Sequence, residues 1–135
     1  MTTSKIILLY ILTASFFLAV DLVWLGIVAK KFYQKYLSEF LSAKVNWSAA
    51  MLFYLLFVVG IILFAVLPGL EEESLTRAVL YGALFGFFCY ATYDLSNLAT
   101  LENWPLIVTV TDIVWGSFIS GLTSAFSYWI AGVLL

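Results

Sequence analysis

The sequence predicts an all-α protein: a four-helix transmembrane bundle with an amphipathic surface helix between helices 1 and 2. Of its 135 residues, 64% are hydrophobic and only 10% are charged. A soluble domain carries about 25% charged residues, so this chain has too little polar surface to cover a globule in water. Four apolar stretches are each long enough to cross a hydrocarbon core of about 30 Å. These observations exclude a soluble enzyme.

The composition also excludes several kinds of site. The chain has no histidine and one cysteine. A His-ligated haem, a His/Cys zinc site, a Ser/His/Asp triad and an intramolecular disulfide therefore cannot be built from this chain alone. With six Lys+Arg and a net charge of -2, the chain has no basic surface for nucleic acid. We expect no cofactor, and no partner that is a nucleic acid.

The first span is predicted at residues 6–28, where Asp21 is the single charge. A cleaved signal peptide is the alternative, because Lys5 precedes an apolar run. The run is long, however, and no small-x-small cleavage site closes it. We therefore favour a membrane-spanning helix.

Three further spans follow. The second is predicted at residues 49–67 and is expected to stop at Pro68-Gly69, a pair typical of helix ends. The third is predicted at 78–100 and the fourth at 105–130. Because the connections after the second and third spans are short, consecutive helices should be antiparallel neighbours in one integral membrane domain, residues 1–135.

Residues 30–44 are predicted to form the amphipathic surface helix. Its charged and polar positions include Lys31, Lys35, Ser38 and Glu39. Apolar residues recur opposite them at three- and four-residue steps: Phe32, Tyr33, Tyr36, Leu37, Phe40 and Leu41.

An even number of spans places both termini on one side of the membrane. Lys5 and Arg77 lie on that side, whereas Lys30, Lys31, Lys35 and Lys44 lie on the other. The positive-inside rule therefore predicts that the termini are outside and the lysine-rich helix is inside.

Three of the spans each carry one aspartate: Asp21, Asp94 and Asp112. Counting about 1.5 Å per residue from the helix ends places all three roughly 9 to 10 Å below the lysine-rich face. A carboxylate costs about 2.5 to 3.5 kcal/mol at the centre of a spanning helix, and somewhat less near an interface. The three side chains should therefore face the interior of the bundle.

Helical spacing places each aspartate on a small or polar stripe. Gly82, Gly86 and Gly116 are expected to allow close approach of neighbouring helices. Asp21-Leu-Val-Trp24 also resembles Asp112-Ile-Val-Trp115 on an antiparallel helix, which is compatible with an inverted arrangement but establishes no duplication. The predicted ligand or ion pocket consists of Asp21, Asp94, Asp112, Tyr90, Tyr93, Asn97, Trp24, Trp115 and Thr109.

No Lys, Arg or His lies within the spans to neutralise the carboxylates. Three carboxylates close together in a low dielectric cannot all remain ionised, so some hold protons or a cation lies among them. The first hypothesis is a protein that binds or moves a proton, a metal ion or a small organic cation. A homodimer is expected in that case, because four spans are few for a pathway.

Two other classes of function stay open. One is a membrane enzyme acting on an isoprenoid or lipid, with a protonated Asp as general acid and aromatic faces stabilising a carbocation. The other is an accessory subunit of a membrane complex that binds its partner through Gly82 and Gly86. A purely structural role, with protonated carboxyls holding the helices together, is the alternative to all three. We favour a function that is not enzymatic.

Five sequence motifs are typical of a known bacterial family. They are Asp21-Leu-Val-Trp-Leu-Gly26, Val45-Asn-Trp-Ser-Ala-Ala50, Ala91-Thr-Tyr-Asp-Leu-Ser-Asn-Leu-Ala-Thr100, Trp104-Pro-Leu and Asp112-Ile-Val-Trp-Gly116. With them the chain resembles, over nearly its whole length, the small four-helix proteins described as predicted membrane proteins with a domain of unknown function. The resemblance implies a bacterial inner-membrane location and assigns no catalytic role to any residue.

Overall fold

The structure is a computed structural model that describes residues 1–134, and its regular elements are all helices. The first membrane-spanning helix, α1 (Thr3–Val23), continues as a π-helical segment (Trp24–Val28). The remaining elements are α2 (Lys30–Leu37), α3 (Trp47–Ile61), a second π-helical segment (Ile62–Val66), α4 (Leu67–Glu71), α5 (Leu75–Thr100) and α6 (Leu106–Leu134).

Four continuous helical stretches are long and apolar enough to cross a membrane: Thr3–Val28, Trp47–Glu71, Leu75–Thr100 and Leu106–Leu134. Many of their large apolar side chains point outward; Ile27, Leu56 and Phe88 are each more than 60% exposed. Such a surface suits contact with acyl chains and not with water. The predicted all-α, four-span fold is confirmed.

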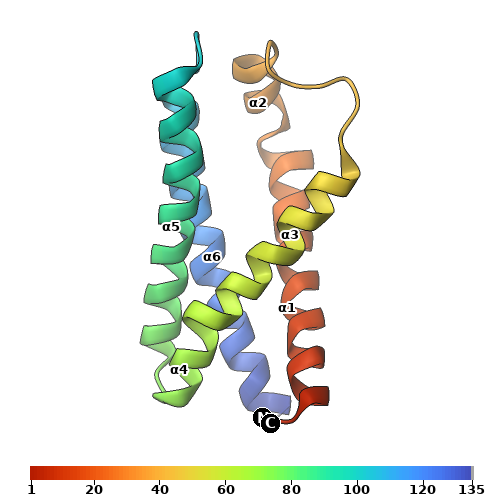
Figure 1. The fold of residues 1–135 in the computed structure, drawn as a ribbon, viewed down its shortest axis with the longest axis vertical. Helices are drawn as coiled ribbons and strands as arrows, with labels where there is room; N and C mark the ends of the chain where they lie inside the picture. Colours follow the sequence, from red (N-terminus) through yellow and green to blue (C-terminus); the bar gives the residue numbers. More distant parts are fainter. Residues whose placement is uncertain (135) are drawn as a thin grey trace.

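The bundle has two distinct ends (Figure 1). The two termini and the turn between α4 and α5 lie at one end, which we call the termini end. The helix α2, with Lys30, Lys31 and Lys35, and the α5–α6 connection lie at the other, which we call the lysine end. The helices α5 and α6 pack against each other along most of their length, whereas α3 runs obliquely from α1 towards the lower part of α5.

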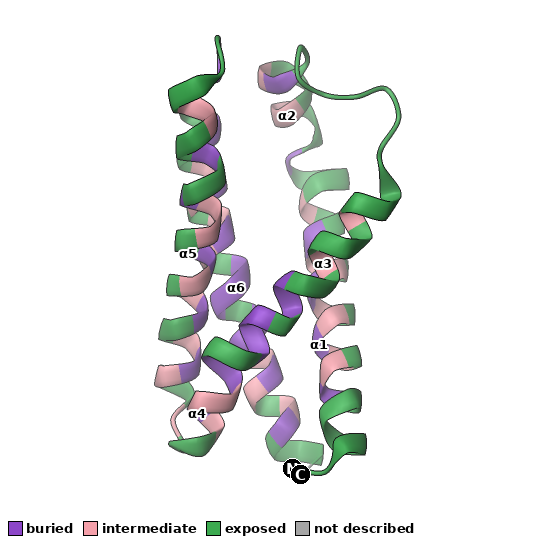
Figure 2. Ribbon diagram, viewed as in Figure 1, coloured by how far each residue is buried: buried purple, intermediate pink, exposed green. Residues whose placement is uncertain are grey.

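The apolar core lies mainly in the middle and towards the termini end. Phe17 of α1, Ile61 of α3 and Ile119 of α6 are fully buried in one cluster. A second cluster at the lysine end packs Leu37 of α2 against Trp104 and Val108. Buried residues face inward on the helices, whereas the connection between α2 and α3 is exposed (Figure 2).

The predicted surface helix is shorter than expected. It ends at Leu37 and not at residue 44. A short helix in a protein owes its stability mainly to the packing of its apolar face. Leu37 is 8% exposed and packs in the second cluster, but Leu41, one turn later, is 51% exposed. The chain therefore leaves the helix after its last well-packed turn.

The second span is longer than the predicted 49–67. Its helix continues through Pro68 and Gly69 to Glu71. The π-helical turns just before Pro68 are wider than α-helical turns, which accommodates a ring that would otherwise clash with the preceding turn. Gly69 serves close packing here, because a Cβ at this position would lie 2.6 Å from the Cβ of Ala78.

Candidate functional site

The three intramembrane aspartates are all buried. Asp21, Asp94 and Asp112 are 4%, 0% and 9% exposed, and they come from α1, α5 and α6 respectively. Each therefore faces the interior of the bundle, as its helical stripe predicts. We call these three residues the carboxylate cluster.

The Asp21 carboxylate has two hydrogen-bond donors from other helices. The hydroxyl of Tyr54 on α3 donates to Oδ2 at 2.6 Å, and the indole N–H of Trp115 on α6 donates to Oδ1 at 3.0 Å. Hydrogen bonds to a carboxylate stabilise its ionised form. Asp21 thus lies in a site that suits a carboxylate, and it connects three helices.

The Asp112 carboxylate has a donor from the surface helix. The hydroxyl of Tyr33 on α2 donates to Oδ1 of Asp112 at 2.5 Å and accepts the indole N–H of Trp24 at 3.2 Å. Burial, followed by the hydrogen bond to Asp112, raises the pKa of Tyr33 far above its usual range. Tyr33 therefore stays protonated and remains a donor.

The two Asp-x-x-Trp segments form a crossed arrangement between α1 and α6. The rings of Trp24 and Trp115 are stacked, with centroids 4.3 Å apart and planes 8° from parallel. Trp115 donates directly to Asp21 on the opposite helix, and Trp24 reaches Asp112 through the hydroxyl of Tyr33. The two similar segments therefore have similar roles in the structure. In each segment the indole N–H is linked by hydrogen bonds to the carboxylate on the other helix, directly for Trp115 and through Tyr33 for Trp24.

Asp94 differs from the other two aspartates. Within residues 1–134, neither of its carboxylate oxygens has a hydrogen-bond donor. Its carboxyl group lies beside that of Asp112, close enough for a hydrogen bond between them. Two ionised carboxylates are acceptors only, so such a bond forms when one of the pair carries a proton. A hydrogen bond between Asp94 and Asp112 would therefore require a proton on one of the two carboxyl groups.

The other residues of the predicted pocket differ in how closely they approach the carboxylates. Tyr90 is half-buried and lies within electrostatic reach of Asp21 and Asp112. Thr109 is 1% exposed, but its hydroxyl accepts from the indole of Trp104 at 3.1 Å and points to the main-chain carbonyl of Asp94, not to a carboxylate. Trp24 and Trp115 are in the site, as described above.

Tyr93 does not belong to the interior of the pocket. It precedes Asp94 by one position, which rotates it by about 100° around the helix, and it is 58% exposed. Asn97 is half-buried and lies beside Tyr93. The structure therefore places these two residues at the edge of the carboxylate cluster, where Tyr93 is still within electrostatic reach of Asp94 and Asp112.

The three glycines lie where α5 and α6 come closest. A Cβ at Gly82 would overlap the side chain of Ser124, and one at Gly86 would overlap the main-chain oxygen of Gly116 and the side chain of Ser120. A Cβ at Gly116 would overlap the ring of Tyr90. These positions therefore keep the α5–α6 pair tight and hold Tyr90 against α6.

Sequence reasoning missed Tyr33 and Tyr54 as members of the site. The sequence pattern places Tyr33 on the apolar face of the surface helix, and Tyr54 is one of several aromatic residues in an apolar span. A buried tyrosine hydroxyl usually requires a hydrogen-bond partner, and a carboxylate is the strongest acceptor in such surroundings. The pairing itself depends on which helices meet, which the sequence does not specify.

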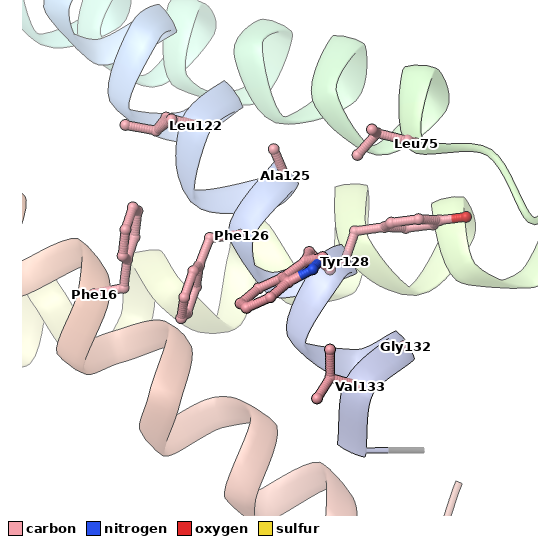
Figure 3. A pocket seen from close by; sticks show the side chains of 9 residues that line it. Phe16, Leu75, Leu122, Ala125, Phe126, Tyr128, Gly132 and Val133 are labelled. Carbon is pink, nitrogen blue, oxygen red and sulfur yellow. The ribbon is translucent and has the colours of Figure 1, made fainter.

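Neither of the two best-defined grooves contains the carboxylate cluster. The larger, of about 680 Å³, lies on the outer surface beside the lower half of α6, between Phe16 of α1 and Leu75 of α5 (Figure 3). From Asp112 to Phe126, which lines this groove, is about 21 Å along α6 at 1.5 Å per residue. A ligand in this groove would therefore lie far from the acids.

Among residues 1–134, no group of three or more His, Cys, Asp or Glu side chains is arranged to hold a metal ion. The cluster instead combines one carboxylate that has two donors with a pair that faces each other. Chemically, such a pair can take up, hold and release a proton without any base from the protein.

Comparison with known proteins identifies a family for this chain. Residues 6–129 match the family model described as a predicted membrane protein (DUF2177). No curated protein and no solved structure matches the chain. The family model covers nearly all of the chain, including the carboxylate cluster, the second and third apolar helices and most of the first and fourth. The chain therefore belongs to the DUF2177 family, and it is a multi-pass membrane protein.

Proposed function

We propose that this protein binds and releases a proton inside the membrane, and that Asp94 and Asp112 are the groups that hold it. The observation that carries the proposal is the state of Asp94: it is 0% exposed, and both its oxygens lack a donor. An isolated ionised carboxylate in such a place would be strongly destabilising. A proton between Asp94 and Asp112 removes one charge and supplies the missing hydrogen bond.

The proton is a better ligand for this site than a metal ion. Hard cations such as Mg²⁺ and Ca²⁺ are held by several oxygen ligands around one position. Both carboxylate oxygens of Asp21 already accept hydrogen bonds, from Tyr54 and Trp115, and Oδ1 of Asp112 accepts one from Tyr33. The donors that occupy these oxygens leave few free for a metal, whereas one shared proton needs only the two facing carboxyls.

The lysine end is the side from which we expect the proton to enter. Tyr33 belongs to α2, which lies outside the membrane-spanning helices, and its hydroxyl contacts Asp112 directly. Beneath the cluster, Phe17 and Ile119 are fully buried in the apolar core and separate it from the termini end. In the predicted orientation the lysine end is the cytoplasmic side.

Infrared spectroscopy of the protein in lipid vesicles tests the proposal. A protonated carboxylic acid has a carbonyl stretch distinct from that of a carboxylate. We expect such a band in the wild type, and we expect it to disappear as the pH is raised. Asp94→Asn should abolish the band, because Asp112 can then remain ionised with donors from Tyr33 and from the new amide.

Glu102→Gln is the matched control, because it also removes one carboxyl group but lies in the exposed connection before α6. It should leave the band unchanged. If Asp94→Asn and Glu102→Gln give the same spectrum as the wild type, the shared proton does not exist and the proposal is wrong.

Transport is a further step, which vesicles with an entrapped pH indicator can measure after a pH jump. A transporter would equilibrate the interior faster than empty vesicles, and Asp94→Asn would remove the difference. A homodimer would provide the missing part of a pathway, and chemical crosslinking in the vesicles would detect it. Proton binding without flux would limit the function to proton storage or sensing.

A further inference from the structure

We propose that the groove between the first half of α3 and α5 binds one acyl chain of an anionic phospholipid from the leaflet at the lysine end. The groove has a volume of about 530 Å³. Its lining residues are Ala49, Leu52, Phe53, Leu56, Phe57 and Cys89. All six are apolar or weakly polar, so a hydrocarbon chain suits the groove better than water does.

The groove exists because α3 leans away from α5 in its first half. Tyr54 and Leu55 bind α1, through the hydrogen bond from Tyr54 to Asp21 and the one from Tyr10 to the carbonyl of Leu55 at 2.9 Å. The helix reaches α5 mainly through the later π-helical segment and α4. The opposite side of α3 therefore meets α5 only near Phe57, which packs against Phe85 and Tyr90, and Figure 1 shows the oblique course of α3.

The length of the groove matches one leaflet. From Ala49 to Phe57, α3 rises about 12 Å at 1.5 Å per residue. Half of a hydrocarbon core of about 30 Å is about 15 Å. The groove begins near the start of α3 and ends at mid-membrane beside Cys89, where the ring of Phe57 lies 6.0 Å from that of Tyr90. One acyl chain from the lysine-end leaflet therefore fits without crossing to the other leaflet.

The charge at the groove's entrance favours an anionic head group. Lys44 is exposed and lies three residues before α3, whose first residue, Trp47, is 64% exposed. An exposed Trp at this level is typical of the membrane interface. The lysine end as a whole has four lysines, at positions 30, 31, 35 and 44, against Glu39 and Glu102. A phosphate at the interface would therefore meet net positive charge.

Native mass spectrometry can test this site. The wild type, purified with equal phosphatidylglycerol and phosphatidylcholine, should retain one phosphatidylglycerol molecule in preference. Leu56→Trp should lose this lipid because the indole fills the groove. Leu63→Trp is the matched control, since Leu63 is 53% exposed on the same span but does not line the groove. It should retain the lipid.

Lys44→Gln separates the head group from the chain. It should keep one bound lipid but lower the preference for phosphatidylglycerol about five-fold, the effect of about 1 kcal/mol for one lysine at an anionic surface. If the wild type retains no lipid, or if Leu56→Trp and Leu63→Trp retain it equally, the groove is not the site. Equal retention of both lipids by the wild type would overturn the anionic selectivity.

The chain's single cysteine gives a second measurement in the unmodified protein. Cys89 lines the inner end of the groove and is half-buried. In delipidated protein, N-ethylmaleimide should alkylate Cys89, and added phosphatidylglycerol should slow the reaction more than phosphatidylcholine does. An unchanged rate with both lipids would contradict the proposal even if Leu56→Trp does not fold.

Discussion

The two halves of the bundle bury polar groups in different ways. At the lysine end, Asp21 and Asp112 are held by hydrogen bonds that come from other helices. Towards the termini end, the buried polar groups are the hydroxyl of Thr13 on α1 and serine and threonine hydroxyls of α6, among them Ser124 and Ser127. The hydroxyl of Ser124 donates to the carbonyl of Ser120 on its own helix at 2.8 Å.

The difference follows from what each group requires. A serine hydroxyl can be satisfied by its own helix, so a second helix can pack directly against it. In this half Gly82 lies against Ser124, whose hydroxyl is satisfied in this way, and Gly86 lies against Ser120. The buried hydroxyls of Ser120 and Thr123 have no hydrogen-bond partner within residues 1–134. A carboxylate has no donor on its own helix and must recruit long side chains such as tyrosine and tryptophan. We call the half at the termini end the hydroxyl half and the half at the lysine end the carboxylate half. The hydroxyl half is tightly packed, whereas the carboxylate half contains the groups that can exchange a proton.

The largest effect should come from breaking the hydroxyl half. Gly86→Leu would place a side chain into the main-chain oxygen of Gly116 and into Ser120. Overpacking usually costs about 1–3 kcal/mol of stability. We expect a loss at the upper end of this range or above it, because a backbone atom cannot move aside as a side chain can. Detergent unfolding followed by circular dichroism measures it. Gly132→Leu, where a Cβ would meet nothing within 4 Å, should be close to neutral.

The carboxylate half should give effects of opposite sign at two of its members. Asp21→Asn leaves the donors from Tyr54 and Trp115 facing an amide, one of whose groups is itself a donor. We expect a loss of about 1–3 kcal/mol, the cost of an unsatisfied buried group. Asp94→Asn should instead stabilise the protein by about 1 kcal/mol, because the amide can donate to Asp112 without first taking up a proton, whereas the Asp94 carboxyl must be protonated to do so.

The same unfolding experiment measures both variants. Loss of stability in both, by similar amounts, would mean that Asp94 has a partner as good as those of Asp21. The contrast between the satisfied and the unsatisfied carboxylate would then be wrong. If Asp94→Asn unfolds less readily than the wild type and also lacks the infrared band, the protonated carboxyl destabilises the fold. Such a result would support a functional role for Asp94.

Much of this contrast follows from the sequence, and some of it does not. The apolar stretches and the helical stripes predict the four spans and the inward direction of Asp21, Asp94 and Asp112, because these depend on local periodicity and on the cost of a charge in lipid. The donors Tyr33 and Tyr54 depend on how α2 and α3 meet the bundle. Such contacts between distant segments leave no periodic signal in a single sequence.

The donor from the surface helix should have a smaller effect. Tyr33→Phe keeps the ring but removes the hydroxyl that links Trp24 to Asp112. We expect a loss of about 1–2 kcal/mol, because two hydrogen bonds are removed and the usual net value of each is about 1 kcal/mol. We also expect a change in tryptophan fluorescence as the indole N–H of Trp24 loses its acceptor. Tyr36→Phe on the same helix is the control, with its ring packed against Phe32. Equal effects of the two variants would remove Tyr33 from the site.

The smallest effect should come from a pair of hydroxyls that joins α1 and α6 in the half of the bundle at the termini end. The oxygens of Thr13 and Ser127 lie 2.8 Å apart, and both residues are fully buried. A double-mutant cycle with Thr13→Val and Ser127→Ala should give a coupling energy of about 0.6 kcal/mol. This is the average for hydrogen bonds between membrane helices. Each hydroxyl can turn to a carbonyl of its own helix when its partner is lost, so little is left unpaired.

The cycle of Tyr54→Phe with Asp21→Asn should give a larger coupling energy, because a carboxylate has no such substitute. Equal couplings in the two cycles would mean that both halves bury their polar groups at the same cost, and that the carboxylates need no functional explanation.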